Sequence, residues 1–242
     1  MSLSFERFQE TLQGAGLLGA FPPDSLPSLV QFSQKMLDWN KSLNLTRWTQ
    51  DEDFLRYHLL DSAYAVPLAK DLLPGPARWL DLGTGCGFPG VVLAAADPHR
   101  EVALLDSVAK KTKALDDCLQ GTGWKAQTLT GRAEDLGRDP MAREALDGVS
   151  ARAVADLPVV LEYALPLLRV GGYLVNWMTA DQLSEEASAQ GALETLQGRI
   201  VQRVPYSLPG LSQPRVLLVV EKLGKTPEAF PRAVGVPSKK PL

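Results

Sequence analysis

The sequence predicts an α/β fold, in which a helical region precedes a mostly parallel seven-stranded sheet with an antiparallel last strand. From Trp79 onward, short apolar runs alternate with helix-length amphipathic stretches, a pattern typical of βαβ units around a sheet buried on both faces. Before Trp79, apolar residues recur near the helical period, which indicates helices. Segments 199–208 and 214–223 flank a short loop with Pro and Gly, which indicates an antiparallel pair.

The helical region covers residues 1–70. Its clearest part is the segment 25–45, where Leu, Val and Met residues repeat at helical spacing. Asp24 and Ser25 lie at the start of this segment as candidate caps. Pro27 lies in its first turn, where a missing N–H costs little. We therefore expect one long helix here.

A further helix is expected over residues 52–70, bent or ended at Pro67, because proline lacks the N–H that a helix interior uses. A Pro-Gly-Pro stretch then indicates a linker. These boundaries predict a helical cap over 1–73, a core over 74–224 and a basic tail over 225–242.

The core contains five apolar runs of strand length before the antiparallel pair. They cover residues 78–83, 100–107, 125–131, 147–154 and 171–177. Three amphipathic stretches between them are predicted as crossover helices, at 89–98, 108–121 and 157–168.

Composition narrows the class of protein. The formal net charge is −3 and 45% of the residues are hydrophobic, as in a soluble globular protein. No apolar run approaches the roughly 20 residues that cross a bilayer, and the opening MSLSFERFQE does not resemble a secretory signal. Cys86 and Cys118 are the only cysteines and form no CxxC pair, which predicts neither a disulfide nor a metal site. We expect a cytoplasmic protein.

The last 21 residues, 222–242, are basic, with five Lys and Arg residues against one Glu. Their charge fits a solubilising tail. It also fits a contact for a polyanion, which the acidic remainder of the chain would bind only at particular places.

A glycine-rich stretch, WLDLGTGCGFPG at 79–90, joins the first strand to the following helix. A Walker phosphate loop is excluded, because no Lys-Ser or Lys-Thr follows these glycines. A dinucleotide site stays open, because Gly85, Gly87 and Gly90 form GxGxxG and Asp106 lies about 20 residues further on. The stretch could also be only a tight strand-to-helix turn.

Two details favour S-adenosylmethionine over a dinucleotide. Asp81 ends the first strand, where it would repel a pyrophosphate but could pair with a ligand's ammonium or orient the loop. The turn GRAED at 131–135 follows the third strand and offers groups for an adenine ring. With Asp106 facing a ribose, these residues suit a ligand with an adenine, a ribose and an amino-acid end. We expect Asp81 and Gly85 to contact it.

The chain resembles the bacterial small-subunit ribosomal RNA guanine-N7 methyltransferases, also called the glucose-inhibited division protein B family. The resemblance spans nearly the whole chain, in the expected order. The motifs that carry it are Asn44-Leu45-Thr46 with His58-x-x-Asp61-Ser62, LDLGTGCGFPG, GRAE followed by Ala151-Arg152-Ala153, and FPRAVGVPSKKPL.

The resemblance implies a Rossmann-like class I S-adenosylmethionine-dependent methyltransferase that methylates N7 of a guanine in 16S ribosomal RNA. It assigns the cofactor to Gly83 and Phe88 in the first loop, Asp106, Ser107 and Val108 at the ribose, and Ala133 and Glu134 at the adenine. It places Arg152 near the cofactor or the target base. It places His58, Asn44, Arg132 and Arg215 along an RNA-facing cleft. From the residues alone, Asn44 could instead brace the helical cap, and His58 could be a packed, hydrogen-bonded histidine.

Residues 178–179 depart from the family pattern, which has Lys-Gly where this chain has Met178-Thr179. A cation expected beside the cleft is therefore missing. We therefore predict that restoring the cation with Met178→Lys keeps or raises methylation.

The chemistry of guanine N7 agrees with the residues present. N7 has a lone pair and no proton, so the enzyme has only to align it with the methyl group. Neither cysteine is placed as a nucleophile for cytosine C5, and SARAVADLP stands where exocyclic-amine methyltransferases have an Asn/Asp-Pro-Pro-aromatic turn. Arg152 suits a guanine edge and Arg132 or Arg215 a phosphate, while Phe88 could stack on a base.

The expected partner is 16S ribosomal RNA or the small ribosomal subunit, with no membrane and no metal, and we expect a monomer. Two other functions stay open: a small-molecule methyltransferase of the same fold, and a non-catalytic ribosome-associated RNA-binding module that retains the pocket. A nicotinamide oxidoreductase is tested by cofactor titration.

Overall fold

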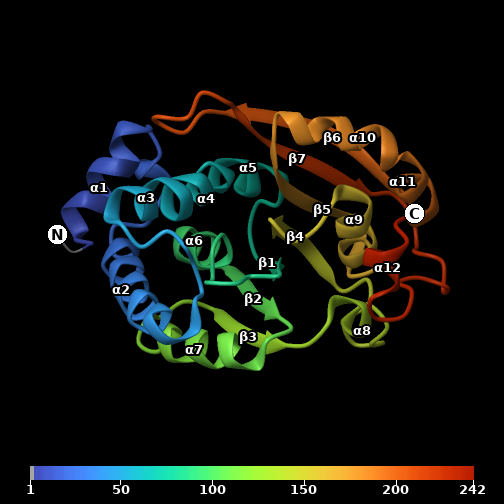
Figure 1. The fold of residues 1–242 in the computed structure, drawn as a ribbon, viewed down its shortest axis with the longest axis horizontal. Coiled ribbons are helices and arrows are strands. Elements are labelled where there is room, and N and C mark those ends of the chain that lie inside the picture. The colour runs from blue at the N-terminus through green and yellow to red at the C-terminus, as the bar shows by residue number, and fades with distance from the viewer. Residues whose placement is uncertain (1–2) are drawn as a thin grey trace. The chain divides into compact units, whose positions relative to one another are not determined.

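The computed structural model describes residues 3–242 (Figure 1). The chain divides into two compact units, Met1–Thr130 and Gly131–Leu242. Its seven strands follow the order β3-β2-β1-β4-β5-β7-β6, which confirms the predicted mixed sheet. The predicted limits after residues 73 and 224 each fall inside one unit and stay predictions.

The first unit begins with helices, as the periodicity predicted. They are α1 (Phe5–Gly14), η1 (Leu18–Ala20), α2 (Ser25–Leu43), α3 (Asp51–Phe54), the π-helical η2 (Leu55–Leu60), α4 (Asp61–Ala63) and α5 (Ala65–Leu72). Asp24 precedes α2, but its side chain makes no capping bond. The Ser25 hydroxyl donates to the Pro22 carbonyl at 2.8 Å, so neither predicted cap acts as one.

The helical run that contains Pro67 is interrupted before the proline and not at it. The run of helices α3 to α5 is interrupted at Tyr64, and Pro67 lies in the first turn of α5. A proline cannot donate to the carbonyl four residues earlier, here that of Ala63, so the interruption falls before the proline. The helix does not end at Pro67, and the interruption lies three residues before it.

The α/β part of the first unit has three parallel strands and two helices. The strands are β1 (Ala77–Leu82), β2 (Arg100–Asp106) and β3 (Ala126–Thr130), and the helices are α6 (Gly90–Ala96) and α7 (Ala109–Leu119). Helix α2 packs against α6 and α7. At this contact Trp39 Nε1 donates to Asp117 Oδ2 at 3.0 Å. The helical cap is therefore continuous with the α/β layer in this unit.

The second unit holds the other four strands. They are β4 (Leu146–Arg152), β5 (Leu168–Thr179), β6 (Gly198–Tyr206) and β7 (Arg215–Lys222), and β7 runs antiparallel to both β5 and β6. Its helices are α8 (Ala133–Leu136), α9 (Leu157–Ala164), η3 (Asp181–Ser184), α10 (Glu185–Ser188), α11 (Gln190–Leu196) and α12 (Val236–Lys239). None of the helices in the described part of the chain could cross a membrane.

A buried lysine ends β7. Lys222 Nζ donates to the Leu165 carbonyl at 2.8 Å and to the Thr226 hydroxyl. Burial lowers the pKa of Lys222 to about 8, while the nearby Glu144 carboxylate acts in the opposite direction. Lys222 therefore stays protonated at neutral pH, although burial of its charge lowers the stability of the fold.

We predict that Lys222 makes the free energy of unfolding rise between about pH 8 and pH 10. The folded state releases this proton near pH 8, whereas the unfolded chain keeps it up to the usual pKa of 10.5, so the unfolded state binds more protons in between. Urea denaturation of Lys222→Met should lack the rise. The wild type must be compared with Lys222→Met because a second group titrates in the same range. Burial raises the pKa of the Cys118 thiol to about 12, which lowers the free energy of unfolding of both proteins above pH 9. Parallel pH profiles would contradict the prediction.

Candidate functional site

The glycine loop, residues 83–89, connects β1 to α6 and is braced by one carboxylate. Asp81 is buried at the end of β1. Its Oδ2 accepts a hydrogen bond from the Thr84 hydroxyl at 2.6 Å and from the Gly90 amide at 3.1 Å. One oxygen therefore joins the start of the loop to the first residue of α6. Of the two roles considered for Asp81, loop orientation is directly visible, and contact with a ligand's ammonium stays a prediction.

Three glycines of this loop have left-handed backbone, with φ of 65° at Gly83, 59° at Gly85 and 96° at Gly87. Gly90 is required for space, since an added Cβ would lie 2.4 Å from Leu104 Cδ2. Around Gly85 the space is open, and the nearest atom to an added Cβ would be the Gly83 carbonyl oxygen at 3.9 Å. A ligand can therefore approach the backbone at Gly85.

Asp106 at the end of β2 connects this loop to the next one. Its Oδ2 accepts from the Gly85 amide at 3.2 Å and its Oδ1 from the Val108 amide at 2.9 Å, and the Lys111 ammonium lies 3.8 Å from Oδ2. Ser107 is exposed, and Val108 is 43% exposed. Four of the predicted cofactor residues thus lie together at the carboxyl ends of β1 and β2.

Phe88 has a packing role. Its ring is 3% exposed and lies 5.5 Å from the Phe54 ring, 6.0 Å from the Phe32 ring and 5.2 Å from the His58 ring, measured between centroids. A ring enclosed in this way has no open face, so the idea that Phe88 stacks on a target base is not supported. Its contact with the cofactor stays a prediction. His58, 3.8 Å from Cys86 Sγ through Nδ1, belongs to the same buried cluster.

Asn44 ends α2 with left-handed backbone and an exposed side chain, and its amide donates to the Asn40 carbonyl at 3.2 Å. The Asn40 carboxamide then bonds both backbone groups of Thr46, at 2.8 and 3.0 Å. Thr46 Oγ1 lies 2.6 Å from His58 Nε2. These contacts favour bracing of the helical cap by Asn44, Thr46 and His58. An RNA contact by Asn44 or His58 stays a prediction.

In the second unit, Glu134 has the lowest exposed fraction of the predicted site residues. It is 1% exposed at the start of α8, directly after Arg132 and the buried Ala133. Its Oε1 accepts from the Gly235 amide at 2.9 Å and from Arg132 Nη2 at 3.4 Å. Its Oε2 has no hydrogen-bond partner among the described residues. Burial alone would raise the pKa of Glu134, but these hydrogen bonds outweigh burial and lower it, so the group is a charged acceptor.

Two predicted arginines lie at the same edge of the sheet in this unit. Arg152 ends β4 opposite Trp177 of β5, and Arg215 begins β7 opposite Thr179 of β5. Because β7 is antiparallel to β5, its first residue lies at the end where β4 and β5 finish. Their partners Trp177 and Thr179 flank Met178 along β5, so Met178 points to the opposite face of the sheet from both arginines.

Met178 itself is 2% exposed. An ammonium at this position would lose its hydration. We therefore expect Met178→Lys to lower the free energy of unfolding by about 2 kcal/mol or more, and the expectation of unchanged or higher methylation stays a prediction. Urea denaturation checks this, with Met178→Leu as the volume-conserving control; a lysine variant as stable as Met178→Leu would contradict it.

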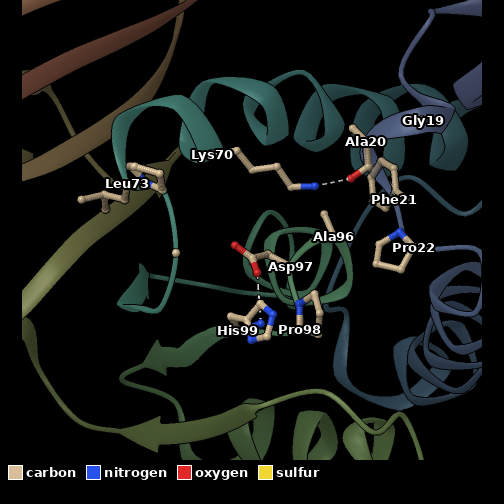
Figure 2. Close-up of a pocket in the computed structure, with 12 residues that line it drawn as sticks. Gly19, Ala20, Phe21, Pro22, Lys70, Leu73, Ala96, Asp97, Pro98 and His99 are labelled. Atoms are coloured by element: carbon tan, nitrogen blue, oxygen red, sulfur yellow. Dashed lines mark hydrogen bonds between the residues drawn. The ribbon is translucent and has the colours of Figure 1, made fainter.

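A cavity of about 570 Å³ lies at the opposite ends of β1 and β2, and Figure 2 shows the residues that line it. Two of its polar side chains serve the fold. Lys70 Nζ donates to the Ala20 carbonyl at 2.7 Å, and Asp97 Oδ1 accepts from the His99 amide at 3.0 Å. Ligands of open parallel sheets bind at the carboxyl ends of the strands, which favours the glycine loop.

Known proteins match nearly the whole chain. A family model, GidB, described as rRNA small subunit methyltransferase G, matches residues 25–213. The ribosomal RNA small subunit methyltransferase G of Roseiflexus sp. (strain RS-1) is 39% identical over 218 residues, 90% of this chain and 92% of that protein. The protein of the same name from Desulfitobacterium hafniense (strain Y51) is 38% identical over 220 residues, 90% of each chain.

Among solved structures, the fibrillarin pre-rRNA processing protein of Methanococcus jannaschii has a TM-score of 0.50 and 17% identity, over 62% of this chain and 68% of that one. At this identity the likeness shows the fold alone, which with the strand order is that of class I methyltransferases. The family match decides membership, since it runs from the start of α2 past the end of β6. The chain belongs to the rRNA small subunit methyltransferase G family.

Proposed function

We propose that this protein transfers the methyl group of S-adenosylmethionine to N7 of one guanine in 16S ribosomal RNA. The observation that carries the proposal is the braced glycine loop with Asp106 beside it, in a chain whose residues 25–213 match a family of rRNA methyltransferases. When bound, the cofactor supplies an electrophilic methyl group.

Each unit holds residues that suit a part of the cofactor. A carboxylate has about four lone-pair sites, and Asp106 uses two of them for the Gly85 and Val108 amides. It can therefore also accept hydrogen bonds from ribose hydroxyls. Glu134 Oε2, which has no hydrogen-bond partner within residues 3–242, suits a donor such as the exocyclic amine of adenine. Open backbone at Gly85 admits the amino-acid end.

No general base is needed, because guanine N7 has no proton to lose. The described residues agree with this requirement. His58 is buried in an aromatic cluster, and burial raises the pKa of the Cys118 thiol to about 12, so that thiol cannot act as a nucleophile at neutral pH. The chain's task is to align the base with the methyl group.

Arg132, Arg152 and Arg215 are proposed to bind the RNA. Arginine is suited to this because its planar guanidinium binds phosphate and base edges in two-point contacts. None of the three is fully buried. Neutral variants of a phosphate-binding arginine should weaken RNA binding at every sequence and reduce its salt dependence.

The test is mass mapping of 16S ribosomal RNA from cells with and without the gene, followed by reconstitution with purified protein. Loss of a single 7-methylguanine, restored by the wild-type protein, supports the proposal. An unchanged modification map refutes it. Reconstitution on naked RNA, on an assembly intermediate and on complete subunits identifies the substrate. Methylation of a small molecule without RNA would instead favour a small-molecule methyltransferase of the same fold.

A further inference from the structure

The last part of the chain is fixed to the second unit by a set of arginines. Arg143 Nη1 donates to the carbonyls of Gly137 and Phe230, at 3.0 and 2.7 Å, and its Nη2 to those of Thr226 and Pro227, at 2.8 and 3.2 Å. We call residues 223–242 the C-terminal segment. A guanidinium that binds four carbonyls holds the backbone at 226–230 close to the loop around residue 137, so this part is not a solvated tail.

Close packing continues after these contacts. An added Cβ at Gly137 would lie 2.9 Å from Pro231 Cγ, so only glycine fits there. The next residue, Arg232, makes a two-point ion pair with Glu162 of α9. Its Nε and Nη2 donate to the two carboxylate oxygens at 2.9 and 2.6 Å, and its backbone amide donates to Oε1 at 2.8 Å. Glu162 is fully buried, so charge and backbone together fix Arg232.

Three residues after Arg232, the chain turns at Gly235. Its φ is +78°, which residues with a side chain rarely adopt, and it directly precedes α12. This turn directs the Gly235 amide to Glu134 Oε1 at 2.9 Å. Figure 1 shows the C-terminal segment, in red, running beside α8 and α9, and α12 packs against α9.

The consequence for Glu134 is an unequal use of its two oxygens. Oε1 has two donors, the Gly235 amide and Arg132. Oε2 is buried with no hydrogen-bond partner in residues 3–242. Leaving a buried carboxylate oxygen unbonded costs free energy, and an adenine amine would recover it.

We infer that the C-terminal segment is a positioning element of the cofactor site: the Gly235 amide, held in place by the Arg232–Glu162 pair, turns Glu134 so that Oε2 accepts a hydrogen bond from the adenine amine. The inference rests on the proposed function, since Glu134 is the adenine contact there. It makes Gly235, Arg232 and Glu162 positioning residues that act through Glu134.

A double-mutant cycle tests this inference by calorimetric titration with S-adenosylhomocysteine. The first variant, Glu162→Gln with Arg232→Gln, removes both charges of the pair and leaves no unpaired buried charge. The second is Glu134→Gln, and the third combines all three substitutions. Lys239→Gln, on an exposed residue of the same segment, is the matched control for charge.

We expect Kd to rise about tenfold in the first variant and at least as much in Glu134→Gln, as for a lost hydrogen bond to a charged group. The combined variant should lose no more than Glu134→Gln alone, because the segment acts only through Glu134. The control should bind as the wild type does. Losses that add in the combined variant, or a first variant with wild-type Kd, would overturn the inference.

A measurement on the wild-type protein covers the case in which the first variant does not fold. Amide hydrogen exchange at Gly235 should slow when S-adenosylhomocysteine binds, and unchanged exchange would overturn the inference. S-Inosylhomocysteine, which carries an oxygen in place of the amine, should bind the wild type at least about tenfold more weakly. A wild-type protein that binds neither ligand would overturn the proposed cofactor site and the inference together. Binding without the predicted coupling would overturn the inference alone.

Discussion

Gly90→Ala should abolish measurable binding of S-adenosylmethionine and destabilise the first unit. The added Cβ would lie 2.4 Å from Leu104 Cδ2 and 2.7 Å from Asp81 Cβ. Both neighbours are buried in the strands on which the loop is built, so the loop and the start of α6 must move. Overpacking of this kind costs about 1–3 kcal/mol or more, and a displaced loop no longer presents Gly85 to the ligand.

Calorimetric titration with S-adenosylhomocysteine and urea denaturation measure the two effects. Gly14→Ala, in α1 of the same unit, is the matched control, because an added Cβ there meets nothing within 4 Å. It should be neutral or slightly stabilising, since alanine favours helix. If Gly90→Ala behaved like this control, the close packing of α6 on β2 would be wrong.

Asp81→Asn should weaken the binding of every adenosine ligand at least tenfold and lower the free energy of unfolding by roughly 2–3 kcal/mol. The carboxylate oxygen accepts from both the Thr84 hydroxyl and the Gly90 amide. In the asparagine variant the acceptor oxygen is uncharged, so both hydrogen bonds to it become weaker. An NH₂ group, which donates and does not accept, replaces the other oxygen. The loop should therefore loosen where it enters α6.

The two roles of Asp81 predict different ligand dependence. 5′-Methylthioadenosine has the adenosine part of the cofactor but no ammonium. If Asp81 acts by bracing the loop, Asp81→Asn loses the same factor in affinity for 5′-methylthioadenosine and for S-adenosylhomocysteine. A loss confined to S-adenosylhomocysteine would show that Asp81 binds the ammonium. Thr84→Val removes one of the two donors to Asp81. It should lower the affinity for both ligands by the same factor, and by less than Asp81→Asn does.

The sheet could be predicted from the sequence because its strands are short, apolar and separated by turn residues. All seven predicted strands are present within a few residues. Asp106 and Gly85, which the sequence assigned to one ligand, are joined by a hydrogen bond, because the ends of adjacent parallel strands meet at one edge. The helices between 181 and 196 were missed, since DQLSEEASAQGALETL has few apolar residues and its helices are short.

Other features depend on contacts between distant parts of the chain. Glu134 and Gly235 are 101 residues apart, and no local pattern connects them. The surroundings of Phe88 come from α2 and α3, so the sequence of the loop could not show that its ring is enclosed. The burial of Met178 likewise follows from the packing of β5, which residues 178–179 by themselves do not show.

The bonds of Asp81 to Thr84 and Gly90 have a consequence for the energetics of ligand capture. They use only atoms of the protein, so the loop takes its form during folding rather than on encounter. The conformational entropy of ordering these residues has then already been lost when a ligand arrives. The free energy of each new contact can appear as affinity instead of being spent on ordering the chain.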